Sequence, residues 1–187
     1  MAVLDVLPYP NPFLRKRAND VEVFDDRLRQ IVADMEETMA AEDGIGLAAT
    51  QVGIDLRLLI LSRYAFEGEE GRDKPNLVVI NPEIVWESEA STLGEEGCLS
   101  FPGVYIQVER PQKVRIRARD SAGETYEIEG EGLGARAILH EIDHLEGVVM
   151  IDHVSHLTRK RALKKHQRNQ KAIVTRRRED ARKARKG

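Results

Sequence analysis

Hydrophobic residues recur along the chain at two spacings, and each spacing predicts one kind of element. Between positions 28 and 39 the apolar side chains return every three or four residues, which is the period of a helix that buries one face. Asp25 or Asp26 is placed to cap the first turn of this helix, and Gly44 ends it. The same period returns from 132 to about 145 and predicts a second helix with one apolar side.

Alternation of apolar and polar residues predicts a sheet. In VRIRAR, positions 114–119, apolar residues alternate with arginines, so this strand buries one face, and the turn at 120–123 predicts a hairpin with the strand that follows. Strands are predicted at 56–61, 77–80, 83–86, 104–108, 114–119 and 125–128. The segments 44–53 and 63–76 are predicted to be a glycine-containing loop and a surface excursion. This order of elements predicts an α+β fold, with mainly antiparallel β-sheets around one buried helix.

The distribution of charge divides the chain into two parts. Its 187 residues suffice for one medium domain and an appendage. The net charge of −3 hides an asymmetry, because residues 159–187 hold fourteen Lys and Arg against two acids, a net charge of +12. Residues 1–158 then carry a net charge of −15. We expect a folded domain at 1–158 and a basic helical extension at 159–187.

Two features of the sequence indicate a cellular compartment. Asp5 and three prolines interrupt the first twenty residues, where a signal peptide needs an unbroken apolar stretch, and no later apolar run approaches the length of a membrane span. The single cysteine, Cys98, excludes an internal disulfide and fits a reducing compartment. We therefore expect a cytoplasmic protein with no membrane partner.

The segment from His140 to His144, HEIDH, is the sharpest chemical signal in the chain. Residues four apart lie one turn apart on the same face of a helix, so both imidazoles can bind one metal ion. Glu141 projects about 100° round the helix from His140, which places it to reach a water at the metal as a general base. The alternative is a structural helix with two ordinary histidines.

A hydrolytic metal centre needs a third protein ligand and an open position for water. Met150 stands where a longer zinc-protease motif would place a third histidine, and Asp152 and His153 are weak substitutes. Upstream, Cys98 lies in the segment EEGCLS and would complete a Cys-His-His set. A single cysteine is more often a buried, inert side chain, although the histidine pair favours ligation.

Three segments resemble, in order, the signature motifs of the peptide deformylases: GIGLAATQ at 44–51, EGCLS at 96–100 and HEIDHLEG at 140–147. The resemblance covers about residues 5–155 and makes 1–158 a catalytic metallohydrolase domain. It implies metal-dependent hydrolysis of the N-terminal formyl group from the formyl-methionine of nascent polypeptides, with release of formate. The alternatives are a zinc endopeptidase that uses the same helix, and a ribosome- or RNA-associated module with a decayed metal site.

The resemblance also implies a role for each site residue. The implied metal ligands are Cys98, His140 and His144, the implied catalytic groups are Glu141, Gln51 and the backbone amide of Leu99, and the implied contacts to the substrate main chain are Ile45, Gly46 and Gly97. Glu96 and Arg110 match a pair that would orient Cys98 from behind the metal. A side-chain amide and a backbone N–H suit a developing oxyanion, because both donate hydrogen bonds without net charge.

Two positions depart from the family pattern. Leu139 stands where many members carry glutamine, and Arg136 stands where some have an apolar pocket residue. Both leave the chemistry intact and affect the pocket for the first side chain of the substrate, which the resemblance implies is methionine. It also implies Fe(II) as the one divalent metal ion in the cell, while Cys-His-His ligands suit zinc, nickel or cobalt as well.

The basic tail has an implied partner of its own. In some deformylases a C-terminal helix of this kind anchors the enzyme to the ribosome, and ribosomal RNA would attract residues 159–187 strongly through charge. The alternative is a solvated helix, or a disordered extension that folds back on the acidic body. Nothing in the tail predicts base-specific recognition of a nucleic acid.

Overall fold

The computed structural model describes residues 2–184, with side chains as far as Arg176. Its helices are α1 (Asp26–Ala41), α2 (Tyr64–Glu67), α3 (Leu133–Leu145) and α4 (His156–Ala184). Its strands are β1 (Gly46–Ala48), β2 (Leu58–Leu61), β3 (Leu77–Glu87), β4 (Ser91–Gly97), β5 (Tyr105–Pro111), β6 (Lys113–Arg119) and β7 (Thr125–Glu131). Four short 3-10 helices lie at Pro12–Arg15, Ala49–Val52, Gly68–Gly71 and Met150–Asp152.

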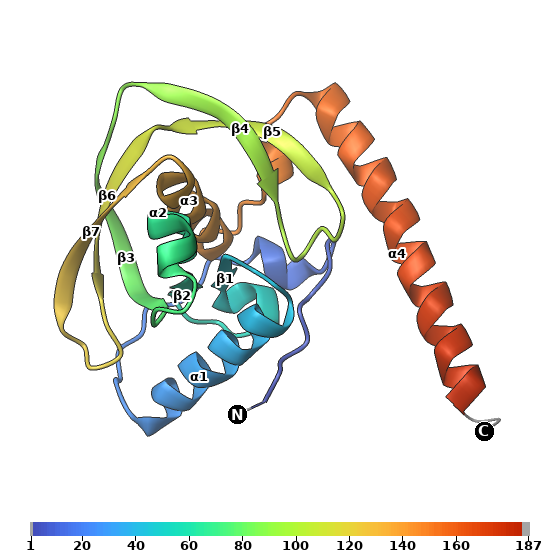
Figure 1. The fold of residues 1–187 in the computed structure, drawn as a ribbon, viewed down its shortest axis with the longest axis horizontal. Helices are drawn as coiled ribbons and strands as arrows, with labels where there is room; N and C mark the ends of the chain where they lie inside the picture. The colour runs from blue at the N-terminus through green and yellow to red at the C-terminus, as the bar shows by residue number, and fades with distance from the viewer. Residues whose placement is uncertain (1, 185–187) are drawn as a thin grey trace.

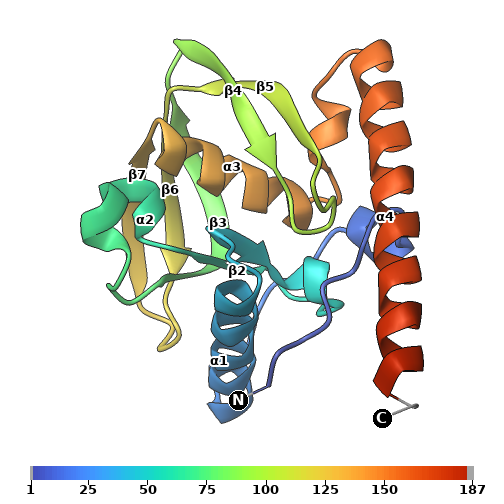
Figure 2. The ribbon, with the colours of Figure 1, turned by 45° about the vertical axis from the view of Figure 1, so that its right-hand side comes forward.

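The described strands form two antiparallel sheets around α3. The larger sheet has the order β1-β2-β3-β6-β7, and β4 and β5 form a separate two-stranded sheet. Figures 1 and 2 show α3 enclosed between the β4–β5 hairpin and the larger sheet. The predicted α+β fold with mainly antiparallel sheets around one buried helix is therefore confirmed.

Helix α3 packs in the core through an apolar face that the spacing of its hydrophobic residues predicts. Ile138, Ile142 and Leu145 recur at helical spacing and are buried against the strands of the larger sheet. Each fully buried aliphatic side chain of this kind contributes roughly 1.5–3 kcal/mol. Helix α1 covers the other side of β2 with Met35 and Met39, and Asp25 caps its first turn by accepting from the Leu28 backbone N–H at 2.9 Å.

The structure differs from the predicted elements at four places, three of them in the strands. The segment 44–53 contains β1, because Gly46 to Ala48 pair with β2 at the sheet edge. The two strands predicted around Asn81 are the single strand β3, which continues through a register shift where Asn81 adopts a φ of +50°. Strand β4 was not predicted, and residues 63–76 contain α2 and a 3-10 turn.

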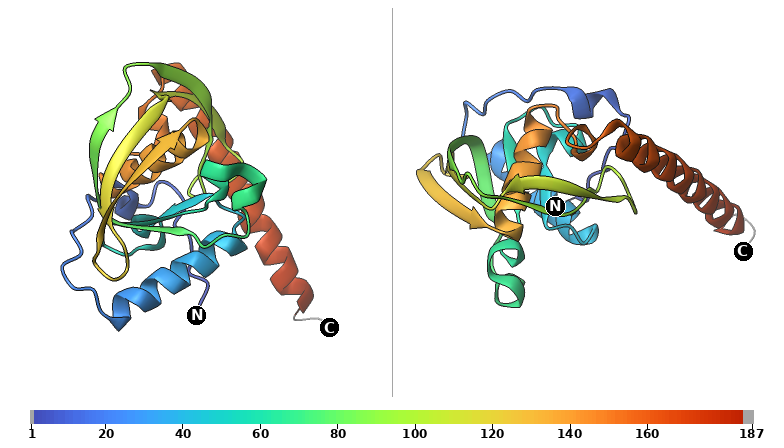
Figure 3. Two further views of the ribbon diagram at one scale, coloured as in Figure 1. Left: turned by 60° about the vertical axis from the view of Figure 1, so that its left-hand side comes forward. Right: turned by 90° about the horizontal axis from the view of Figure 1, so that it is seen from above.

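Helix α4 begins just before the predicted extension and packs on the body along its first half. His166 is buried, and its Nε2 lies 2.6 Å from the carbonyl oxygen of Tyr9. The side-chain amide of Asn169 donates to the carbonyl of Pro102 at 3.0 Å. Figure 3 shows the helix running past the sheets toward the C-terminus. Within residues 2–184, no helix has the length and apolarity that crossing a membrane requires.

Candidate metal centre

The two histidines predicted as ligands lie on the buried face of α3. Their rings are 5.1 Å apart, and the exposed fractions of His140 and His144 are 8% and 1%. Cys98 follows directly after β4, and its Sγ lies 3.2 Å from Nε2 of His144. One ligand atom from each of these three residues lies within 4.8 Å of the other two, which makes them the one candidate metal-binding group among the described residues.

The donor set of this group fits a divalent ion. Thiolate and imidazole ligands bind Zn²⁺ at about 2.3 and 2.0 Å in a tetrahedral arrangement, which three donors at this mutual distance can provide. The substitutes considered downstream do not lie at the site. Asp152 pairs with Arg15, and His153 lies 2.7 Å from the carboxylate of Asp143.

Behind the metal group, the buried carboxylate of Glu96 collects several donors. Nδ1 of His140 lies 2.9 Å from Oε2 of Glu96. This contact occupies Nδ1, so Nε2 is the ring nitrogen that can bind a metal ion together with Cys98. Arg110 donates to both oxygens at 2.8 and 3.1 Å, which is the pairing that the family resemblance implied. Burial alone would raise the pKa of Glu96, but the hydrogen bonds from His140 and Arg110 hold it well below its ordinary value.

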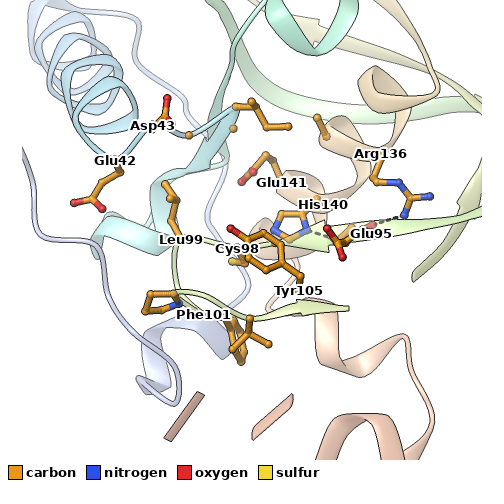
Figure 4. Close-up of a pocket in the computed structure, with 18 of the residues that line it drawn as sticks. Glu42, Asp43, Glu95, Cys98, Leu99, Phe101, Tyr105, Arg136, His140 and Glu141 are labelled. Carbon is orange, nitrogen blue, oxygen red and sulfur yellow. Dashed lines mark hydrogen bonds and ion pairs between the residues drawn. The ribbon is translucent and has the colours of Figure 1, made fainter. Parts of the chain in front are cut away.

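Glu141 lies against β1 with its carboxylate at the pocket (Figure 4). A Cβ built on Gly46 would be 2.9 Å from Cδ of Glu141, so a glycine at this position leaves room for the carboxyl group. Burial raises the pKa of Glu141 to about 7, and the charge of His140 opposes that rise. Within the described part of the chain, Oε2 of Glu141 is buried with no hydrogen-bond partner. This carboxyl group can exchange a proton near neutral pH.

Gln51 is brought to the same place by the 3-10 turn after β1. Its Nε2 lies 3.5 Å from Sγ of Cys98 and 3.4 Å from Oγ of Ser100, and its Oε1 accepts from the backbone of Ala48 at 2.9 Å. This last hydrogen bond fixes which end of the amide faces the thiol. The backbone N–H of Leu99 makes none of the hydrogen bonds found among the described residues. The amide of Gln51 thus lies beside Cys98, and the N–H of the next residue in the chain is unpaired among the described residues.

A cavity of about 470 Å³ opens in front of these groups. Its walls include every predicted site residue except His144 and Arg110, which lie behind it. Besides Arg136 and Gly44 of the first motif, the lining that the sequence did not predict is Glu42, Asp43, Glu95, Phe101, Pro102, Gly103, Val104, Tyr105, Leu133 and Ala137. Glu42 and Asp43 directly precede the first motif, and Glu95 and Phe101 flank the second, so their positions could have been inferred. The others depend on how β4, β5 and α3 meet.

The two departures from the family pattern have different outcomes. Leu139 is buried in the core with the strands of the larger sheet and does not line the cavity. Arg136 does line it (Figure 4). Its guanidinium pairs with Glu96, with Nη1 at 3.0 Å from Oε1. Arg136, whose effect on the pocket the sequence left open, therefore lies with Glu96 and Arg110 behind the metal site.

The comparison with known proteins decides the family. The family model described as polypeptide deformylase matches residues 3–160. The chain belongs to this family. It is 50% identical over 170 residues to peptide deformylase 1 of Ralstonia nicotianae, with 89% of this chain and 97% of the relative covered. The crystal structure of a peptide deformylase from Legionella pneumophila matches with a TM-score of 0.86 and 40% identity, over 92% of this chain and 98% of that one.

A second solved structure agrees. The crystal structure of a peptide deformylase from Synechococcus elongatus in complex with actinonin matches with a TM-score of 0.79 and 41% identity, over 88% of this chain and 86% of that one. The activity predicted from the sequence is thereby confirmed. The chain is a peptide deformylase-type, metal-dependent hydrolase that removes the N-terminal formyl group.

Proposed function

We propose that the enzyme works through one divalent metal ion held by Cys98, His140 and His144. When bound, this ion would polarise the formyl carbonyl and activate water as a Lewis acid. The observation that carries the proposal is the convergence of three metal-ligating atoms within 4.8 Å of one another. Glu141, whose buried carboxyl group lines the cavity next to His140, takes a proton from the attacking water and returns it to the leaving amine.

Gln51 and Leu99 stabilise the oxyanion that develops on the formyl group. The amide Nε2 of Gln51 and the backbone N–H of Leu99 flank Cys98 and carry no net charge. Removal of one such donor typically slows catalysis by about 10²–10³-fold. These groups are fixed before substrate binds, because the 3-10 turn and the backbone of Ala48 hold the glutamine in place.

The nascent chain binds in extended form beside Ile45, Gly46 and Gly97. Gly46 lies in β1, which ends the larger sheet, and Gly97 is the last residue of β4, which has one strand neighbour. Edge strands present backbone N–H and C=O groups with which an extended peptide can pair. The first side chain, which we propose is methionine, enters the cavity next to Leu133 and Ala137.

The proposed ligand set is tested by replacing its one sulfur. Cys98→Ser should lose bound metal, measured by elemental analysis of the purified protein, while the control His156→Ala, an exposed histidine at the start of α4, should keep it. Retention of metal by Cys98→Ser would contradict the proposed ligand set, because the histidine pair would then hold the ion without the cysteine.

For the metal itself we propose Fe(II). A soft thiolate with two imidazoles accepts iron as well as zinc, and the family resemblance favours iron. Anaerobic purification followed by metal analysis and an activity assay tests this assignment. Iron that accompanies activity supports it, whereas zinc alone with full activity contradicts it.

We further propose that α4 docks the enzyme on the ribosome in the cytoplasm. One side of the helix packs on the body through Ala162 and His166. Exposed basic residues of the helix are Lys160, Arg161, Lys164, Lys165, Arg168, Lys171 and Arg176, and Lys160, Lys164, Arg168 and Lys171 lie on the side opposite Ala162 and His166. A cationic helix face of this kind suits the phosphate backbone of ribosomal RNA and needs no base contacts.

Co-sedimentation with ribosomes tests this docking. Lys160, Lys164 and Arg168 lie one turn apart on α4, and replacing all three by glutamine should weaken binding and reduce the slope of log K against log salt by about 2–3. The control replaces Arg115, Arg117 and Arg119 on the exposed face of β6 by glutamine. Equal losses from the two triple variants would contradict a role specific to α4.

A further inference from the structure

Arg136 ties α3 to both strands of the small sheet. The residue is 8% exposed, although arginine is rarely buried without partners. Nη1 donates to the Val108 carbonyl of β5 at 2.8 Å and to Oε1 of Glu96 at 3.0 Å. Nη2 donates to the Thr92 carbonyl of β4 at 3.1 Å. One guanidinium thus connects the helix that carries both histidines with the strand that leads to Cys98.

Gly94 provides the space for this guanidinium. It lies in β4 opposite Val108, and a Cβ at Gly94 would be 2.6 Å from Nη2 of Arg136 and 2.8 Å from its Cζ. Such a separation is shorter than real Cβ contacts, so any side chain at Gly94 would displace the guanidinium. The glycine is therefore explained by the arginine that lies against it.

The hydrogen bonds at Glu96 show what Arg136 does there. An ionised carboxylate has about four acceptor sites. All four are used, two by Arg110, one by Arg136 and one by His140. Arg110 also pairs with Asp143 at 2.8 Å, so it is shared between two carboxylates, whereas Arg136 pairs with Glu96 alone among the described acids.

We propose that Arg136 is a positioning residue for the metal centre, acting through Glu96 on His140. By occupying Oε1 it fixes the carboxylate so that Oε2 faces Nδ1 of His140. This hydrogen bond sets the imidazole tautomer and the direction of Nε2. The inference rests on the proposed metal ligands and adds Arg136 and Gly94, with Gly94 keeping the guanidinium in place.

Two other roles would leave a different signature. A guanidinium that only joins α3 to the small sheet would affect the stability of the metal-free protein and leave metal retention unchanged in the folded enzyme. A pocket-wall residue would change KM for a formyl-methionyl peptide and leave metal retention unchanged. Metal retention therefore distinguishes the positioning role from both.

The experiment measures how fast the metal-loaded enzyme loses its ion to an excess of chelator. Arg136→Met should lose it about 10-fold faster or more, because residues that orient a ligand from behind typically change metal affinity by 10–100-fold. Arg136→Lys should be intermediate, since it keeps the charge with one donor group. The control Arg115→Met removes an exposed arginine of β6 and should match the parent.

Gly94→Ala supplies an independent perturbation and a second variant should Arg136→Met not fold. Alone it should also speed metal loss, because it displaces the guanidinium. In the Arg136→Met background it should add little, since a double-mutant cycle detects residues that act through each other.

Three results would overturn the inference. They are unchanged metal loss in folded Arg136→Met, additive effects in the double variant, and a raised KM with normal metal retention. A parent enzyme that binds no metal would refute the proposed centre itself, which is a separate failure.

Discussion

Gly46 has no side chain, and this leaves the space that the carboxyl group of Glu141 occupies. A Cβ at Gly46 would overlap the carboxylate that we propose transfers protons. Gly46→Ala should therefore lower the rate of formate release by about 100-fold, because a displacement of about 1 Å can cost that much. Metal content should stay at the parent level, since the atoms nearest the added Cβ belong to Glu141, which is not a proposed ligand. Parent-like activity would show that Glu141 has room to move.

Tyr126 gives the fold a measurable pH dependence. Burial raises its pKa to about 12, and its hydroxyl donates to the Val78 carbonyl at 2.7 Å. In the unfolded chain a tyrosine titrates near 10, so between about pH 10 and 12 the unfolded state loses this proton first and the free energy of unfolding falls as pH rises.

The comparison with Tyr126→Phe isolates this residue. Near neutral pH the variant should be about 1 kcal/mol less stable, through loss of the hydrogen bond. The difference in the free energy of unfolding should shrink as pH rises toward 12. The parent loses stability when the tyrosine of its unfolded chain ionises, whereas the variant has no phenol to ionise. Denaturant titrations of both proteins at several pH values measure it. A difference that is constant with pH would contradict the raised pKa.

Chemically distinctive residues were predictable from sequence, whereas their partners were not. His140 and His144 are four apart on one helix, so their meeting follows from helical geometry, and the family motifs supplied Cys98 and Gln51. The role of Arg136 could not be seen, because Glu96 lies 40 residues away and meets it only when β4 packs on α3. The requirement for Gly94 depends on the same packing.

At the scale of elements, the end of α3 is fixed by Gly147. This residue follows the C-cap with a φ of +73°, and a Cβ there would be 2.5 Å from the Arg15 carbonyl oxygen. Gly147→Ala should cost roughly 1–2 kcal/mol of left-handed strain and a further 1–3 kcal/mol of steric conflict.

The matched control for this prediction is Gly53→Ala. Gly53 is also left-handed, but a Cβ there would make an ordinary contact of 3.7 Å with Leu7. It should show the strain alone, so chemical denaturation should rank the two variants. Equal losses would contradict the conflict at Arg15.

Regular patterns predicted elements well, and irregular ones did not. Helices α1 and α3 and the β6–β7 hairpin carry clear periods of 3.6 and 2, and all of them were found. Strand β4 was missed because STLGEEG has two glycines and two acids, which pair with β5 for reasons that only the fold supplies. β1 is three residues long and is stabilised by pairing with β2. The sequence of so short a segment does not show that such a partner exists.

At the scale of the whole molecule, α3 connects the fold with the chemistry. It is buried between two sheets, so its two histidines are held in fixed positions by the packed core. Strand β4 brings the cysteine to them from the other side. The division at residue 158 stays a prediction. Ala162 and His166 of α4 are buried against the body, while the cationic side of the same helix remains available to a partner.

Formate release tests the central claim most directly. The anaerobically prepared, Fe(II)-loaded protein is mixed with a short N-formyl-methionyl peptide, and formate is measured beside the Glu141→Ala variant. We predict rapid release by the parent and near-complete loss in the variant, with metal retained in both, because Glu141 transfers protons without holding the ion. No formate from folded, metal-loaded parent, or equal rates in the two proteins, would contradict the account.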